Sequence, residues 1–132
     1  MDMKSGSNLE KVLKAGHFAF TGELGPPRGT GAEEVRKKAS FLKGNVDAVN
    51  ITDNQTAVVR MASWAACIIL IQEGLEPNFQ MVCRDRNRLA MQSDILGALP
   101  MESGTCCACQ GITRSLATIH WPRASLILIP CN

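Results

Sequence analysis

The chain has 132 residues and a formal net charge of +2, which is enough chain for one ordinary domain. Its 45% hydrophobic and 20% charged content excludes a disordered chain, and the mild charge argues against a nucleic-acid-binding surface. No apolar run is long enough to cross a membrane, and the N-terminus lacks a signal peptide. We therefore expect a cytoplasmic protein with no membrane or nucleic-acid partner. In that reducing compartment we expect the six Cys to be thiols or metal ligands rather than disulfides.

Residues 1–99 alternate helical and extended patterns. Ser7 is a good N-cap for an amphipathic helix over 8–15, and Gly16 occupies the position of a helix C-cap. Strands and helices then alternate three times, over residues 17–24, 32–42, 47–53, 56–73, 77–83 and about 86–99. Strands separated by helices of this length predict parallel pairing, right-handed crossovers and an α/β fold. Three strands are few for a parallel sheet, so the pattern indicates the opening of a longer fold.

Residues 100–132 have a different character. They contain only three charged residues, Glu102, Arg114 and Arg123, but four of the six Cys. No helical period is sustained there, and the only strand-like run is 126–129. We predict that this segment is irregular and separate from residues 1–99.

Polar residues lie at the C-terminal end of each predicted strand, where parallel α/β folds bind ligands. The first strand end carries Glu23, followed by Arg28, the second carries Thr52, Asp53, Asn54 and Gln55, and the third carries Gln80, Cys83, Arg84 and Asp85. Glu23 is a candidate general acid or base, because a carboxylate on a strand end is held in place for proton transfer. The structural alternative is that Glu23 caps the next helix or pairs with Arg28.

A second candidate site lies near the C-terminus. Cys106 and Cys109 form a C-x-x-C pair, and His120 and Cys131 could complete a set of four zinc ligands. The second pair lacks the spacing of a zinc finger or ribbon, and we predict that the four side chains do not converge. A small zinc-binding or interaction protein is the alternative function.

Three segments resemble one enzyme family. The sequence FTGELGPPR at residues 20–28 is similar to the first strand and loop of the methylenetetrahydrofolate reductases, in which an aromatic strand precedes Glu and then Pro-Pro-Arg. The sequences VNITDN at 49–54 and LEPNFQMVC at 75–83 resemble the second and third strands of that family. The resemblance covers about residues 8–99.

The resemblance implies a partial (β/α)8 TIM barrel, about its first three βα units, preceded by a short N-terminal helix. The family is flavin-dependent, and the implied reaction is the reduction of 5,10-methylenetetrahydrofolate to 5-methyltetrahydrofolate with FAD as cofactor and NADH or NADPH as electron donor. A folate and a nicotinamide are then the expected partners, no metal is implied, and a homo-oligomer or a partner subunit stays open.

The resemblance also assigns roles to single residues. Glu23 matches the acid that protonates the folate during iminium formation, while Thr52 and Asp53 match positions that line the flavin and nicotinamide. Gln80 lies where many members have a flavin-contacting His. We predict that Glu23, Thr52 and Gln80 lie together at the C-terminal end of the sheet.

The family's fourth strand normally ends in Gly-Asp, a pair that is missing from residues 100–132. Permitted codons for residues 101–113, read from the third nucleotide of each, give Gly-Ile-Arg-Asn-Leu-Leu-Cys-Leu-Ser-Gly-Asp-His-Gln, a strand that ends in Gly-Asp. This match indicates that residues 100–132 are an out-of-frame translation, through a sequence error or a damaged gene.

A fragment of a barrel would leave apolar side chains without their cover. Unless residues 100–132 lie over them, we expect this loss for strand residues such as Phe18, Phe20, Val49, Ile51 and Phe79. On this basis the 132-residue chain should be partly unfolded or aggregated, and it should not retain FAD.

The nucleotide sequence around codons 97–104 tests the frame shift. We expect a gained or lost nucleotide there, with the family's Gly-Asp encoded downstream in the shifted frame. Codons whose shifted frame lacks Gly-Asp would contradict the out-of-frame interpretation.

Overall fold

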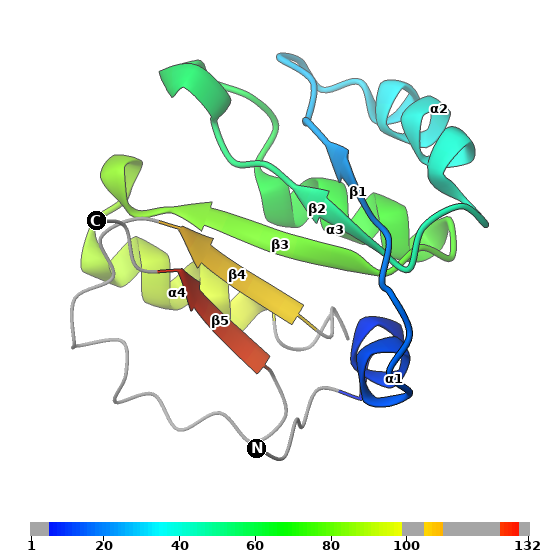
Figure 1. The fold of residues 1–132 in the computed structure, drawn as a ribbon. Helices are drawn as coiled ribbons and strands as arrows, with labels where there is room; N and C mark the ends of the chain where they lie inside the picture. Colours follow the sequence, from blue (N-terminus) through cyan, green and yellow to red (C-terminus); the bar gives the residue numbers. More distant parts are fainter. Residues whose placement is uncertain (1–5, 99–104, 110–124, 130–132) are drawn as a thin grey trace.

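Five parallel strands form one sheet in the order β1-β2-β3-β4-β5 (Figure 1). This computed structural model describes residues 6–98, 105–109 and 125–129, with side chains in the first range only. The strands are β1 (Thr21–Leu24), β2 (Ala48–Ile51), β3 (Pro77–Val82), β4 (Thr105–Cys109) and β5 (Ser125–Ile129). The α-helices are α1 (Asn8–Lys14), α2 (Ala32–Leu42), α3 (Ser63–Gln72) and α4 (Arg88–Ala98), and two 3-10 turns are η1 (Gln55–Ala57) and η2 (Cys83–Asp85).

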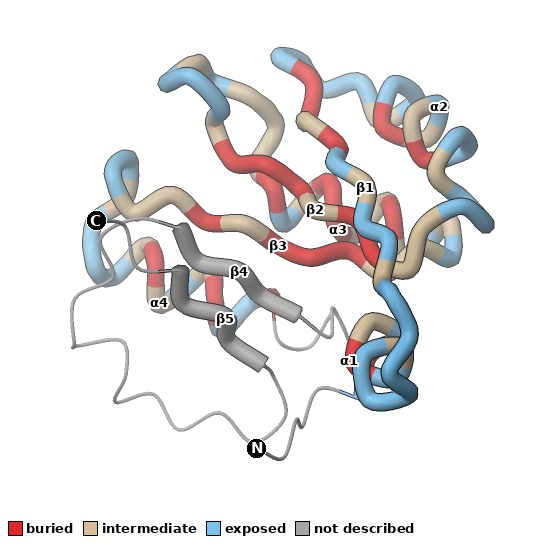
Figure 2. Tube along the Cα trace, viewed as in Figure 1, coloured by how far each residue is buried: buried red, intermediate tan, exposed pale blue. Residues whose placement is uncertain are grey.

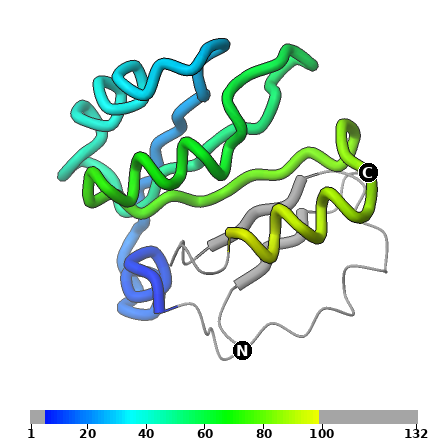
Figure 3. The backbone as a smooth tube through the Cα atoms, turned by 180° about the vertical axis from the view of Figure 1, so that it is seen from behind, coloured from blue at the N-terminus to red at the C-terminus, as the bar shows by residue number. Residues whose placement is uncertain are grey.

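The helices that connect the strands lie on one face of the sheet. α3 and α4 are behind the strands in Figure 1 and in front of them in the reversed view of Figure 3, and α2 joins the same core through Val35 and Ala39. The strand order follows the chain, so right-handed crossovers return every helix to the same side. The α/β class predicted from the sequence is confirmed.

Every second strand residue packs against these helices. Leu24, Val49, Ile51, Phe79 and Met81 are each no more than 1% exposed, and Figure 2 shows the resulting buried segments of β2 and β3. The helices complete this core with Val35, Ala39, Ala66, Cys67, Leu70, Met91, Ile95 and Ala98. The apolar surface that stabilises the fold is therefore buried between the sheet and its helices.

The other face of the sheet is polar. Glu23 is paired in register with Asn50, and Asn50 with Asn78, so these three side chains project from the same face. Gln80 follows Asn78 by two residues and belongs to this face as well. Neither α2, α3 nor α4 covers it (Figure 1).

The expectation that Val49, Ile51 and Phe79 lose their cover is therefore wrong. Because these side chains are buried, their exposure is no longer a reason to expect a partly unfolded chain. These residues are one position out of phase with the polar face, so they point toward the helices and are 0% exposed. Of the expected group, Phe18 and Phe20 are exposed, at 80% and 62%. Their rings contact each other edge to face, with centroids 5.0 Å apart.

α1 lies at the N-terminal end of the strands, away from the polar residues that follow them (Figure 1). The Ser7 hydroxyl accepts a hydrogen bond from the Glu10 amide at 3.1 Å, which confirms the predicted N-cap. The Glu76 carboxylate accepts hydrogen bonds from the amides of Asn8 and Leu9. α1 is thereby attached to the start of β3.

The helix predicted over 56–73 begins only at Ser63. Thr56 and Ala57 have φ values of 58° and 57°, which a right-handed helix does not allow. The amides of Arg60 and Met61 also bind elsewhere, to Asn54 Oδ1 and to the Pro27 carbonyl. The residues predicted as the first turns of this helix therefore form a loop, and hydrogen bonds connect that loop to the loop between β1 and α2.

Residues 100–132 also differ from the prediction. β5 corresponds to the strand-like run at 126–129, but β4 has no counterpart in the sequence analysis. The five residues of β4 pair in parallel with Asn78 to Val82 of β3. This pairing identifies β4 as a strand, and the pattern of apolar residues along the sequence does not show it. Across the parts of the chain that the structure describes, no helix is long and apolar enough to span a membrane.

The core position of Phe79 can be tested directly. Because this ring is 0% exposed in the covered face, Phe79→Ala should lower the free energy of unfolding by about 3–5 kcal/mol. Phe20→Ala, at 62% exposure, should change it by less than about 0.5 kcal/mol. Chemical denaturation of both variants measures the difference, and equal losses would contradict the assignment of the two faces.

Candidate functional site

The sheet brings Glu23, Thr52 and Gln80 to the same end, as predicted. The register pairs Glu23 with Asn50 and Asn50 with Asn78. Thr52 and Gln80 each follow those partners by two residues. The three residues therefore lie at the C-terminal end of the sheet, the end at which parallel α/β folds bind ligands.

Thr52 has an unusual environment. The residue is 5% exposed, and its hydroxyl has no hydrogen-bond partner among the described residues. The hydroxyl oxygen lies 3.6 Å from the point that a Cβ would occupy on Gly25. Buried polar groups are normally satisfied, so this hydroxyl is suited to bind a ligand group that enters beside Gly25.

Glu23 is exposed and is oriented by a contact from the next strand end. The Gln55 side-chain amide Nε2 donates a hydrogen bond to Glu23 Oε1 at 3.2 Å. Within residues 6–98, Glu23 forms no ion pair with Arg28, and no cap to α2 is formed by its side chain. The sequence placed Gln55 at the second strand end but gave it no role, because the contact depends on the turn that replaces the predicted helix.

A cavity of about 360 Å³ lies beside Glu23. Its walls include Gly25 and Arg60 from the two loops and Phe41 from α2. Phe41 is 70% exposed. The cavity thus follows the outer edge of β1, the strand at one end of the sheet.

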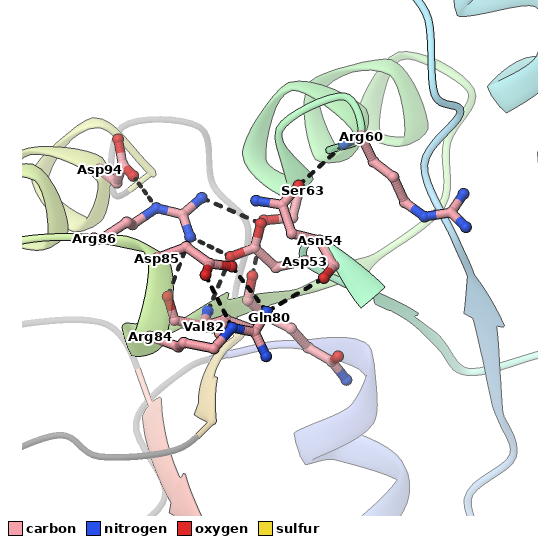
Figure 4. A network of polar contacts seen from close by, with 10 residues as sticks. All are labelled: Asp53, Asn54, Arg60, Ser63, Gln80, Val82, Arg84, Asp85, Arg86 and Asp94. Atoms are coloured by element: carbon pink, nitrogen blue, oxygen red, sulfur yellow. Dashed lines mark hydrogen bonds and ion pairs between the residues drawn. The ribbon is translucent and has the colours of Figure 1, made fainter. Parts of the chain in front are cut away.

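Asp53 is the centre of a buried network and does not join Glu23 (Figure 4). Its Oδ1 accepts a hydrogen bond from Arg86 Nη2 at 3.1 Å, and its Oδ2 accepts bonds from the Val82 amide at 2.9 Å and from Arg86 Nη1. Arg86 Nε donates to Asp94 of α4 at 2.9 Å. Both oxygens of Asp53 are thus engaged within the protein, and the side chain connects β2, β3 and α4.

The charge of Arg86 is maintained by its two carboxylates. Burial by itself would lower the pKa of Arg86, but the hydrogen bonds and charges of Asp53 and then Asp94 outweigh burial and raise that pKa. The two carboxylates therefore favour the charged form of the guanidinium. Arg84 and Asp85 form a neighbouring, exposed ion pair, in which the hydrogen bond from Arg84 lowers the pKa of Asp85.

The predicted zinc ligands lie outside the side chains that the structure describes. His120 and Cys131 lie outside the described residues, and Cys106 and Cys109 are described only as backbone positions of β4. Among the side chains that the structure describes, no group of three or more His, Cys, Asp or Glu could hold a metal ion.

Comparison of the chain with protein-family models, with curated proteins and with solved structures finds no match.

Removal of the Asp53 carboxylate tests its structural role. Asp53→Ala leaves Arg86 partly buried without its main partner, which should lower the free energy of unfolding by about 3–5 kcal/mol. The control is Asp85→Ala, which removes an exposed carboxylate bound to Arg84 and should leave the unfolding midpoint nearly unchanged. Similar midpoints for the two variants would contradict the role of Asp53.

Proposed function

We propose that residues 6–98 are the first three βα units of a (β/α)8 barrel and belong to a flavin-dependent methylenetetrahydrofolate reductase. The observation that carries this proposal is the polar sheet face, with Glu23 at the C-terminal strand ends and the helices α2, α3 and α4 on the opposite side. The resemblance of residues 20–28, 49–54 and 75–83 to that family adds the reaction.

The one-sided arrangement favours a barrel over the other common parallel α/β architecture. A doubly wound sheet carries helices on both faces, whereas here α2, α3 and α4 share one face (Figure 3). A parallel sheet needs cover on both faces, and closure into a barrel supplies it for the second face. The outer edge of β1, beside the cavity at Glu23 and Phe41, is where the closing strand would pair.

Glu23 is proposed as the general acid. Its carboxyl group is exposed at the strand ends, so a substrate nitrogen can approach within hydrogen-bond distance. Proton donation to that nitrogen would open the methylene bridge of the folate to an iminium, which is the electrophile that a hydride then reduces. The strand fixes the backbone of Glu23, which keeps the carboxyl group in the orientation needed for this transfer.

The residues present fit FAD only in part. The unpartnered Thr52 hydroxyl and the side of the polar face that carries Gln80 could hold it, whereas both oxygens of Asp53 bind Arg86 and Val82. We therefore propose flavin contacts for Thr52 and Gln80 and a supporting role for Asp53. When bound, the flavin supplies hydride transfer from NADH or NADPH to the folate.

A chain with the reading frame restored beyond codon 100 tests the function. It should bind FAD, visible as a flavin absorbance band, and it should reduce methylenetetrahydrofolate. In this chain Glu23→Gln should lower kcat by about 10²–10⁴-fold while the flavin band persists. Glu33→Gln, a matched change at a carboxylate that is 88% exposed on α2, should leave both unchanged.

Two results would contradict the proposal. One is a folded, frame-restored chain without flavin or reductase activity. The other is full activity of Glu23→Gln, which would remove Glu23 from the chemistry.

A further inference from the structure

We propose that Gln55 is the positioning residue that orients the carboxyl group of Glu23. The inference rests on the proposed function and names a residue that the family resemblance does not assign. Its basis is the 3.2 Å hydrogen bond from Gln55 Nε2 to Glu23 Oε1, which joins the end of β2 to the end of β1 across 32 positions of sequence.

Gln55 is held by a turn of unusual conformation. Asn54, Thr56 and Ala57 all have positive φ, at 41°, 58° and 57°. Such conformations are unfavourable for non-glycine residues and persist only where the surroundings impose them. Here Asn54 imposes the turn, because its carbonyl accepts the Ala57 amide at 3.1 Å and its side chain accepts the Arg60 amide at 3.0 Å.

The same turn is tied to the loop that follows Glu23. Arg60 Nη1 donates to the Pro26 carbonyl at 3.0 Å, and the Met61 amide donates to the Pro27 carbonyl at 2.8 Å. The loops after β1 and β2 are therefore connected independently of Gln55. Their separation is fixed, which sets the distance between the Gln55 amide and the Glu23 carboxyl group.

The chemistry of an amide suits this role. Gln55 donates to one carboxyl oxygen, and no described residue hydrogen-bonds the other, Glu23 Oε2. An amide has no titratable proton between the pH extremes, so Gln55 can hold the carboxyl group without competing for the proton that Glu23 transfers. Oε2 is then left to face the substrate in a fixed direction.

Side-chain amide relaxation in the 132-residue chain tests the contact without any assay. The order parameter of the Gln55 side-chain amide should be high, near about 0.8, and should fall below about 0.6 in Glu23→Ala. The Gln72 amide, exposed on α3, should be the same in both chains. An unchanged Gln55 amide, or a spectrum without dispersed signals for residues 54–61, would overturn the proposal.

The second test uses the frame-restored chain and the variant Gln55→Met, which keeps the length of the side chain but removes the donor. We expect kcat to fall by about 10–100-fold, with KM and the melting temperature unchanged because Gln55 is exposed. Gln55→Asn keeps an amide donor on a shorter side chain and should give an intermediate kcat. The control Gln72→Met should match the parent chain.

The two tests separate the possible failures. An active parent chain in which Gln55→Met retains full kcat overturns the positioning role and leaves the proposed function intact. An inactive parent chain contradicts the proposed function. In that case the order parameter of the Gln55 side-chain amide is the test of whether Gln55 orients Glu23.

Discussion

Right-handed crossover between consecutive parallel strands is the constraint on which this structure depends. Because β1 to β5 are adjacent in chain order, the connections that contain α2, α3 and α4 return these helices to the same side of the sheet. The apolar residues of the strands are then required on that side, at every second position. The opposite positions are free to be polar, and they hold Glu23, Asn50, Asn78 and Gln80. One rule of handedness therefore separates the core from the candidate site.

Hydrogen bonds also connect the loops around the strand ends to one another. Asp53 and Arg86 join β2 to β3 and α4, while Arg60 and Met61 join the loops after β1 and β2. These contacts are made by buried or half-buried groups at the edge of the polar face. They hold the loops around Glu23 in one arrangement, which the proposed general acid chemistry would require because small displacements of the reacting group are costly.

The sequence predicted the α/β class, the caps of α1 and the position of Glu23, because these follow from local patterns of residues. It did not predict where the apolar strand residues face. The direction in which these residues face depends on the register of the strands, such as the pairing of Glu23 with Asn50. That register is set by tertiary structure and is not visible in the local sequence. It also did not predict the turn at Thr56 and Ala57, since the bonds that impose it come from Asn54 and from the loop after β1. Gln55 and the buried state of Asp53 were missed for the same reason, because both depend on contacts between strand ends.

The central claim is that the polar face is the inside of a barrel that further strands would close. A crystal structure of the frame-restored chain tests it most directly. The account predicts that β1 is hydrogen-bonded to a strand on each side and that Glu23 points into the mouth of the closed barrel, beside Gln55 and Thr52. A structure in which β1 stays at the edge of an open sheet, or in which helices cover the face that carries Glu23, would contradict the account.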